Sequence, residues 1–395
     1  MLKNLTLFLV LAGVLTYCTQ QEKQKKVIID NGLDFDRIHE TVYISLSSLD
    51  MEAEQAQQIA VLDDLGRRVE IQLVDQEKDG QPDGFLFQPE VKAKQSATYF
   101  VKVMTEKLSA TASPVCYSRF VPERIDDYAW ENDRVAFRMY GPTAQRMKEE
   151  GIDGGIISSG IDCWLKKVSY PIINKWYLAN KTTPGAYHID HGEGLDDYHV
   201  GISRGCGGLA VKEGEQFFLP ENYSAYNTLS TGKIRTAFNL DFAEFKVGDR
   251  IVKLSNHIEL DKGSNLSKIV VAIDDSPAVA VGMAIGEELG EIKENKAKGW
   301  VSYWQKHNGS FLATAILCNP DDYQGLEVFQ SDIKDESNVY INLKVNSGKV
   351  TYYSGFTWTK AAQFSSKAEW YEYLNQVSDQ HTNPLQVKID RSSIL

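Results

Sequence analysis

The chain has 395 residues, enough for two domains or for one large β-domain with elaborations. With 43% hydrophobic and 24% charged residues it can bury a core, which excludes a disordered chain. Its 54 acidic and 42 basic side chains give a formal net charge of −12. A general nucleic-acid binder is therefore not expected, because it needs a basic face to neutralise phosphates. The 19 Tyr, 16 Phe and 7 Trp residues fit a β-rich protein with surfaces on which sugars can stack.

The N-terminus has the features of an export signal. A short positive start precedes the apolar run Leu5–Leu15, which is too short to span a bilayer stably. Leu15–Cys18 resembles the lipobox of bacterial lipoproteins, although Tyr17 stands where Gly, Ala or Ser is usual. We expect residues 1–18 to be a lipoprotein signal peptide and Cys18 a lipid anchor, with plain secretion as the alternative. The polar residues 19–26 are then a tether, and the protein is expected in the periplasm or at the cell surface.

Four further cysteines have irregular spacings: Cys116, Cys163, Cys206 and Cys318. The absence of a Cys-x-x-Cys pair disfavours a zinc ribbon and a thioredoxin-like site. An exported chain could pair them, but so large a core needs no cross-links, and we favour buried free thiols.

Short alternating runs rich in Val, Ile, Tyr, Phe and Thr recur along the chain without a βαβ rhythm, which indicates antiparallel sheets in a sandwich. Predicted strands include Thr41–Ser47, Val69–Val74, Thr98–Met104, Arg134–Tyr140, Tyr198–Arg204, Arg235–Phe242, Ile251–Leu260, Lys268–Ile273, Ala278–Ile285, Val301–Lys306, Phe311–Leu317, Val339–Val345 and Val350–Phe356. Helices are predicted at Thr143–Glu150 and at Ser366–Gln380, the latter with Ser366 as N-cap. We expect a mainly β protein with an N-terminal β-region (27–112), a large sandwich (113–365) and a C-terminal helix and tail (366–395).

Polar, aromatic and glycine residues gather in three clusters in the middle of the chain. In the first, WENDRVAFRMYGP (130–142), a strand would place Arg134 and Arg138 on one face. On a solvent-exposed face, two arginines can bind carboxylates or sulfates through forked hydrogen bonds. The alternative is a salt-bridge ladder with neighbouring acidic residues.

The second cluster combines basic and aromatic residues around DCWLKK (162–167) and the later Lys175–Tyr177. Trp164, Trp176 and Lys166 could form a sugar-stacking surface with a positive charge. Lys beside Trp is equally common on ordinary amphipathic surfaces, so this signal is weak.

The third cluster, YHIDHGEG (187–194) followed by DYHVGISRGCGG (197–208), holds three of the seven histidines: His188, His191 and His199. Its glycines allow backbone and ligand to approach closely, and the density of titratable groups favours function over structure.

This third cluster allows two chemistries. His188, Asp190, His191 and Glu193 could hold a divalent metal, but the spacing is not His-Glu-x-x-His and the glycines disfavour a helix, so no cofactor is expected. The other chemistry is acid–base catalysis by His and Tyr, with Arg204 or Lys166 neutralising an anion. The remaining histidines His39, His257 and His307 are isolated, and structural roles are expected for them, although His307 could lie at the rim of a site.

Together, the three clusters resemble a family of bacterial secreted or lipid-anchored proteins found in polysaccharide-utilisation gene clusters and long catalogued as a domain of unknown function. The resemblance rests on WENDRVAFRMYGP, GIDCWLKKVSYPIINKWY and YHIDHGEGLDDYHVGISRGCGG, and covers most of the chain after the tether. It implies a fold similar to galactose-mutarotase-like and polysaccharide-lyase β-supersandwiches, with residues 113–365 as the catalytic supersandwich. It also implies the activity of the ulvan oligosaccharide dehydratase, a hydro-lyase.

That activity removes water from a uronic acid at the non-reducing end of an anionic oligosaccharide and leaves a 4,5-unsaturated uronyl residue. A base must remove the C5 proton, an acid must protonate the leaving 4-hydroxyl, and a cation must neutralise the carboxylate. We expect His188 or His191 as base and Tyr198 or His199 as acid. The expected substrate-binding residues are Arg134, Arg138, Trp164, Lys166, Trp176 and Arg204.

Three alternatives remain open. A polysaccharide lyase would use the same proton abstraction but expel a sugar. A mutarotase-like epimerase would give no product that absorbs in the ultraviolet. A non-catalytic glycan-binding lipoprotein would need only the aromatic and basic surface. The expected partner in each case is a saccharide, with no nucleic acid and with membrane contact only through the lipid anchor.

Overall fold

A computed structural model describes residues 24–106, 113–274, 276, 278–286 and 289–394 of the chain. Strands dominate, and the α-helices of this part are α1 (Pro142–Glu149), α2 (Ile173–Thr182) and α3 (Lys367–Thr382). The prediction of a mainly β protein with antiparallel sheets and a C-terminal helix is confirmed. The predicted signal peptide and Cys18 lie outside the described residues. Within them, no helix has the length and apolarity needed to cross a membrane.

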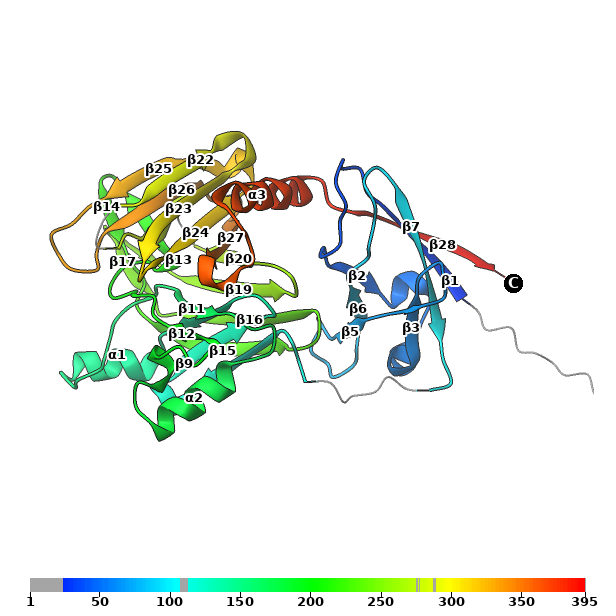
Figure 1. The fold of residues 1–395 in the computed structure, drawn as a ribbon, viewed down its shortest axis with the longest axis horizontal. Coiled ribbons are helices and arrows are strands. Elements are labelled where there is room, and N and C mark those ends of the chain that lie inside the picture. Colours follow the sequence, from blue (N-terminus) through cyan, green and yellow to red (C-terminus); the bar gives the residue numbers. More distant parts are fainter. Residues whose placement is uncertain (1–23, 107–112, 275, 277, 287–288, 395) are drawn as a thin grey trace, which may run out of the picture.

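The N-terminal unit has its own core between two small sheets, which lie apart from the larger unit in Figure 1. One sheet has the order β28-β1-β7-β3-β4 and the other the order β2-β6-β5. The strands are β1 (Gln24–Asp30), β2 (Val42–Ser45), β3 (Ile59–Leu62), β4 (Arg68–Val69), β5 (Ile71–Val74), β6 (Gly84–Phe87), β7 (Ser96–Val103) and β28 (Gln386–Ile394).

Two segments of this unit differ from the predicted organisation. Strand β1 begins at Gln24, inside the segment expected to be a tether. Residues expected to be a tail form β28, which pairs antiparallel with β1 along its whole length. The C-terminal segment therefore returns to the N-terminal sheet, as the red and blue strands of Figure 1 show.

The larger unit is built on an eight-stranded antiparallel sheet in the order β15-β16-β19-β20-β27-β24-β23-β22. Its strands are β15 (Tyr223–Ser230), β16 (Arg235–Phe242), β19 (Leu254–Asp261), β20 (Leu266–Ile273), β22 (Glu291–Asn295), β23 (Trp300–His307), β24 (Ser310–Cys318) and β27 (Lys349–Trp358). The short hairpin β17 (Phe245–Val247) and β18 (Arg250–Val252) adjoins it.

Two five-stranded sheets share the main hydrophobic core with the eight-stranded sheet. One contains β13 (Cys206–Glu213), β14 (Gln216–Phe218), β21 (Ala278–Ala284), β25 (Tyr323–Phe329) and β26 (Asn338–Lys344). The other contains β8 (Tyr117–Val121), β9 (Asp127–Glu131), β10 (Ala136–Met139), β11 (Asp162–Lys166) and β12 (Gly194–Asp196). Contacts such as Phe137 with Phe356, whose ring centroids are 5.3 Å apart, join the layers.

Helix α3 covers the opposite face of the eight-stranded sheet. Trp370 and Leu374 are buried against Trp300, Trp304 and neighbouring residues of that face. The hydroxyl of Ser366 accepts the first-turn amide of Glu369, so the predicted N-cap is confirmed.

Helix α2 was not predicted, and it covers the outer face of the β8–β12 sheet. Its start is held by Glu131, whose carboxylate accepts the backbone amides of Ile172 and Ile173. The ammonium of Lys166 lies 2.8 Å from the same carboxylate, and both side chains are buried. A buried carboxylate on a helix N-terminus is stabilised by the amides and by its counter-ion.

The structure also bears on the predicted strand Tyr198–Arg204 and on the predicted state of the cysteines. The predicted strand Tyr198–Arg204 is wrong: these residues form turns and extended backbone that lead into β13. The prediction of buried free thiols is confirmed for Cys116, Cys163, Cys206 and Cys318.

Candidate active site

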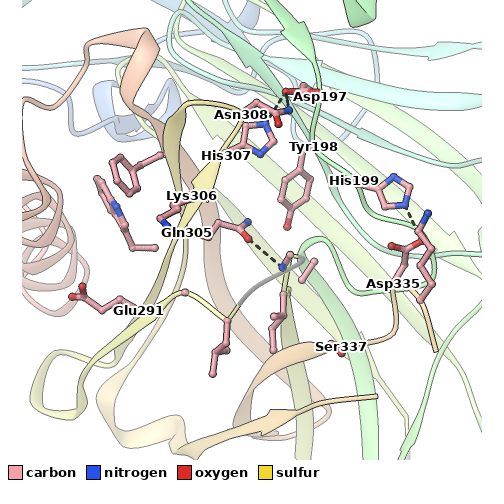
Figure 2. Close-up of a pocket in the computed structure, with 18 of the residues that line it drawn as sticks. Asp197, Tyr198, His199, Glu291, Gln305, Lys306, His307, Asn308, Asp335 and Ser337 are labelled. Atoms are coloured by element: carbon pink, nitrogen blue, oxygen red, sulfur yellow. Dashed lines mark hydrogen bonds and ion pairs between the residues drawn. The ribbon is translucent and has the colours of Figure 1, made fainter. Parts of the chain in front are cut away.

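A cavity of about 1040 Å³ lies at the edge of the eight-stranded sheet, where the edge strand β22 begins. Glu291 of β22 pairs with Trp304 of β23, so the last residues of β23 extend past the end of their neighbour. The rest of the wall comes from residues 197–199 after β12, residues 284–286 at the end of β21 and residues 331–335 and 337 between β25 and β26. Figure 2 shows these side chains around one space.

One wall carries an aspartate–histidine pair. His307, the last residue of β23, is 2.9 Å from the Asp197 carboxylate through Nε2. The amide of Asn308 donates to the same carboxylate oxygen over 2.7 Å. The carboxylate fixes the ring orientation and the tautomer that leaves Nδ1 free to accept a proton. The His307 side chain is 14% exposed, so it lies inside the cavity wall and not on the outer surface.

A second pair lies across the cavity. His199 Nε2 is 2.8 Å from the carboxylate of Asp335, which belongs to the loop between β25 and β26. The His199 side chain is 68% exposed, and its contact with Asp335 holds it at the cavity. Two histidines, each bonded to a carboxylate, therefore face one cavity, which is an arrangement suited to an acid and a base.

Tyr198 lies between these histidines in Figure 2. Its hydroxyl is buried and has no hydrogen-bond partner among the described residues. Burial raises the pKa of this phenol well above its ordinary value. Tyr198 therefore stays protonated near neutral pH, so its hydroxyl can donate a hydrogen bond or a proton to a ligand.

Charges in the wall are partly paired. Glu291 and Lys367 form an ion pair over 2.6 Å. In contrast, Lys306 and Lys334 line the cavity, are exposed, and have no carboxylate within 4.0 Å in the described part of the chain. These two ammonium groups are free to bind an anionic ligand.

The structure corrects the expectation that Arg138 binds substrate. Its guanidinium is buried within 3.6 Å of three carboxylates, those of Asp127, Asp162 and Asp196. The face of β10 that was expected to meet solvent is covered because helix α2 packs on this sheet. Burial and the neighbouring Asp196 carboxylate raise the pKa of Asp162 well above its ordinary value.

The aromatic and basic residues of the second cluster are also internal. Trp164 is fully buried and its ring stacks 5.4 Å from that of Trp176, which is 6% exposed. Lys166 is bound to Glu131 as described above. Trp164 and Trp176 pack in the core between α2 and the sheet, and Lys166 binds the carboxylate at the start of α2. None of the three offers a surface to a sugar.

The remaining predicted cations lie away from the cavity. Arg204 is 1% exposed and donates to the Ser159 hydroxyl and to the carbonyl oxygens of Leu209 and Ile202. Burial lowers its pKa to about 10. Arg134 donates to the Asn265 side chain, and its guanidinium lies over the ring of Phe364.

The predicted base candidates are not brought to the cavity. His188 donates from Nδ1 to the Asp196 carbonyl over 2.6 Å, in the short helix η4 (Ala186–His188). His191 lines a separate, shallow apolar depression beside α2. Over the described ranges, no group of three or more His, Cys, Asp or Glu side chains is arranged to hold a metal ion, including His188, Asp190 and His191.

The structure thus brings together Tyr198 and His199, but not the other predicted site residues. It adds His307, for which a structural role was expected although a place at the rim of a site was left open, and Asp197, Asp335, Lys306 and Lys334, which were not expected as site residues. The signal at His307 was its position at the end of a strand before an Asn-Gly turn. Its pairing with a residue 110 positions earlier gives no local signal.

Comparisons with known proteins agree with the family resemblance. The family described as "Domain of unknown function (DUF4861)" matches residues 29–387. A relative from Formosa agariphila, "Uncharacterized protein P7", is 39% identical over 386 residues, which are 97% of this chain and 98% of that protein.

Two solved structures are similar at 11% sequence identity. A protein in the glycosyl hydrolase family 38 from Enterococcus faecalis gives a TM-score of 0.48 over 94% of this chain. An α-mannosidase from the same species gives 0.42 over 93%. This chain spans about half the length of these structures, 48% and 46% respectively.

Proposed function

We propose that this chain, which belongs to the DUF4861 family, is a dehydratase that removes water from a uronic acid at the non-reducing end of an anionic oligosaccharide. The observation that carries the proposal is the pair of aspartate-bound histidines, His307 and His199, on one cavity with the protonated Tyr198 between them. β-Elimination needs a base and an acid at one sugar ring, and two histidines that line one cavity are the groups that would supply them.

In the proposed reaction, Nδ1 of His307 takes the C5 proton, and Asp197 stabilises the imidazolium that forms. The electrons of the C5–H bond become the C4–C5 double bond as the C4–O bond breaks. His199, protonated and held by Asp335, gives its proton to the departing hydroxyl, which leaves as water. The sugar keeps its chain length and gains one unsaturated bond.

The developing negative charge at C5 spreads into the adjacent carboxylate, so a cation must lie beside that group. Lys334 is suited to this role because it neighbours Asp335 in sequence and has no carboxylate partner within the described residues. The phenol of Tyr198 adds a hydrogen-bond donor that remains neutral, since burial keeps its pKa high.

Site-directed variants test the assignment of base and acid. We expect His307→Ala and His199→Ala to lower kcat by about 10²- to 10⁴-fold, the usual range for loss of a general acid or base. His257→Ala is the matched control, because His257 lies on β19 and bonds to Asn239 and Glu259 away from the cavity. Melting temperatures of all variants should stay close to the wild type.

The alternative outcome is equally specific. If His307→Ala keeps full activity while His188→Ala or His191→Ala loses it, the base is in the sequence-predicted cluster and the proposed site is wrong. If histidine variants of both groups unfold, Asp197→Asn and Asp335→Asn provide milder tests of the same pairs.

The proposal also includes export and anchoring through Cys18. It is supported by the apolar run Leu5–Leu15 and the lipobox-like residues before Cys18. Metabolic labelling with a radioactive fatty acid should label the wild type and not Cys18→Ala. Labelling of both or of neither would contradict the anchor.

A further inference from the structure

The sheet β28-β1-β7-β3-β4 of the N-terminal unit has one face on the core and one face that is partly exposed. Val27 and Ile29 of β1 and Tyr99 and Val101 of β7 belong to the core. The residues between them point to the opposite face, because side chains alternate along a strand. In Figure 1 these strands lie at the end of the molecule away from the larger unit. The outer face of this sheet is therefore accessible to a partner.

The register of the strands gathers basic and apolar side chains on this outer face. Phe100 pairs with Lys26 on one side and with Leu62 on the other. Residues that pair directly in a sheet share a face, so these three side chains are neighbours. The same register adds three further cations and one isoleucine. We define the basic face by these residues: Lys26, Ile28, Leu62, Arg68, Phe100, Lys102 and Lys388.

The apolar side chains of the basic face lie outside the core. Ile28, Leu62 and Phe100 are partly exposed, and within the described ranges none of them packs in the core of the N-terminal unit. They lie among the cations of the same face. Apolar area and positive charge on one surface both strengthen attachment to an anionic membrane.

The charges of the basic face favour an anionic partner. Lys26, Arg68 and Lys102 form no ion pair in the part of the chain that the structure describes. The acidic residues of these strands on the same side are Asp30 and Asp390, and Asp30 is already bound by a lysine over 2.5 Å. The whole chain carries a formal charge of −12. A negatively charged surface therefore attracts this face and repels the rest of the molecule.

The position of the basic face in the chain brings it close to the proposed lipid anchor. Strand β1 begins at Gln24, so residues 19–23 separate it from Cys18. The chain from residue 18 to residue 24 spans at most about 20 Å when fully extended. Lys26 is the third residue of β1 and lies just beyond this span. A second copy of the chain fits the face less well, because identical surfaces would bring cations against cations.

We propose that the basic face is a membrane-docking surface that binds the headgroups of anionic phospholipids. This inference rests on the proposed anchor at Cys18, which keeps the face within reach of the bilayer. Docking directs the larger unit, and the cavity within it, away from the membrane and toward soluble oligosaccharides.

The test is co-sedimentation of lipid-free protein with vesicles. The protein is the chain from residue 18 to residue 395 with Cys18→Ala, so that no lipid can be attached. Vesicles of phosphatidylcholine alone are compared with vesicles that also contain phosphatidylglycerol. We expect binding to the anionic vesicles to be at least about 10-fold tighter, since each cation near such a surface contributes several-fold. This difference should disappear at about 0.5 M salt, which screens the charges.

Charge reversal then locates the binding surface. Lys26→Glu combined with Lys102→Glu should abolish the preference for anionic vesicles. Lys246→Glu combined with Lys253→Glu is the matched control and should keep the preference: these lysines are exposed on the larger unit, and the change in net charge is the same. If the first double variant has a lowered melting temperature, Lys26→Gln combined with Lys102→Gln replaces it, because glutamine adds no acidic group.

Three results would overturn the inference. Equal binding of the unsubstituted protein to both kinds of vesicle would show that the face does not bind anionic lipid. A preference that survives loss of both lysines would place the binding surface elsewhere. Dimers that the Lys26 and Lys102 substitutions dissociate would show that the face binds a second copy. Because the protein carries neither lipid nor substrate, these results are independent of the labelling of Cys18 and of the proposed reaction.

Discussion

At the scale of single residues, the orientation of the proposed base, His307, depends on the turn that follows it. Asn308 and Gly309 connect β23 to β24 with φ values of 42° and 70°, both in the left-handed region. Asn-Gly is the dipeptide that such two-residue hairpin turns favour. Here the asparagine side chain also donates to Asp197, the carboxylate that orients His307. Asn308 is therefore a positioning residue for the base.

Replacing this residue should separate its two roles. Asn308→Gly keeps a residue that adopts positive φ easily, so the melting temperature should not fall. Without the amide, Asp197 loses one of the two hydrogen bonds that it accepts from side chains in the described part of the chain, and we expect kcat to fall about 10-fold while KM stays within a factor of two. Steady-state kinetics and thermal melting measure both effects. Unchanged kcat, or a fall in melting temperature with no separate loss of kcat, would assign Asn308 to the turn alone.

Residue types in the site were predictable only in part. Tyr198 and His199 were found because titratable residues are dense around them. His188 and His191 belong to the same dense segment, yet the short helix η4 and the following turn direct them away from the cavity. Side-chain direction in such irregular segments is set by tertiary contacts, which the sequence pattern does not show.

At the scale of elements, the sheet β8–β12 holds an unusual buried charge cluster between the core and α2. Asp127 accepts a hydrogen bond from Tyr177 of α2 over 3.0 Å and lies 3.6 Å from a guanidinium nitrogen of Arg138. Burial raises the pKa of Asp127 to about 6, above the ordinary value of 3.8. The folded protein therefore keeps a proton on Asp127 at pH values where the unfolded chain has lost it.

This shift makes stability fall as pH rises. Below pH 4, Asp127 is protonated in both states and its contribution is complete; above pH 6 it is ionised in both, and the folded state bears the cost of a buried charge. The difference between 3.8 and about 6 corresponds to about 3 kcal/mol. Asp127→Asn keeps the oxygen that accepts from Tyr177 but cannot ionise.

We therefore expect wild-type protein to lose up to about 3 kcal/mol of unfolding free energy relative to Asp127→Asn between pH 4 and pH 6. Denaturant titrations at several pH values measure this difference. Asp241→Asn, at an exposed position on β16, is the control and should show no comparable trend. A constant difference between wild type and Asp127→Asn across this range would contradict the raised pKa.

Element prediction succeeded where alternation is regular. The strands of the eight-stranded sheet have one face on the core, so their hydrophobic residues repeat at every second position, as in Arg235–Phe242. Helix α2 was missed because it lacks a polar N-cap side chain and is held instead by distant Glu131 and by burial of Ile173, Trp176 and Tyr177. Because α2 was not predicted, Arg138 of β10 was expected to face solvent.

At the scale of the whole molecule, the C-terminal segment packs against the N-terminal unit. After α3, the carbonyl of Asn383 accepts from the buried Arg37, and the amide of Leu385 donates to Glu40. Strand β28 then pairs with β1 at the edge of the N-terminal sheet. The sequence pattern did not reveal β28, because its described side chains are largely exposed and no core-facing alternation marks the segment.

Removal of residues 386–395 should affect the two units differently. Strand β1 would become an edge strand and lose its hydrogen bonds to β28, although it keeps β7 as partner. We expect hydrogen exchange to speed up by at least about 10-fold in β1, since each lost hydrogen bond contributes about 1 kcal/mol, and to remain slow in β23. Equal loss of protection in both strands would show that the units fold as one, and no change in β1 would show that β28 contributes little.

The position of the candidate active site is also a property of the whole molecule. The cavity is assembled from segments of β12–β13, β21, β23, the β25–β26 loop and α3, which are far apart in sequence. Sequence patterns predicted β21, β23 and β26 among the strands that carry these segments, together with two residues of the site, but not β12, β13 or β25. They could not predict where β22 begins against β23, and that boundary opens the cavity.

Elimination of water by this protein is tested most directly by ultraviolet absorbance combined with product mass. Purified protein is incubated with oligosaccharides that end in a saturated uronic acid, with His307→Ala protein as the blank. We expect rising absorbance from the new double bond and a product that has lost one water with its chain intact. Rising absorbance with two shorter chains would identify a lyase, and no absorbance change on any such substrate would contradict β-elimination by this site.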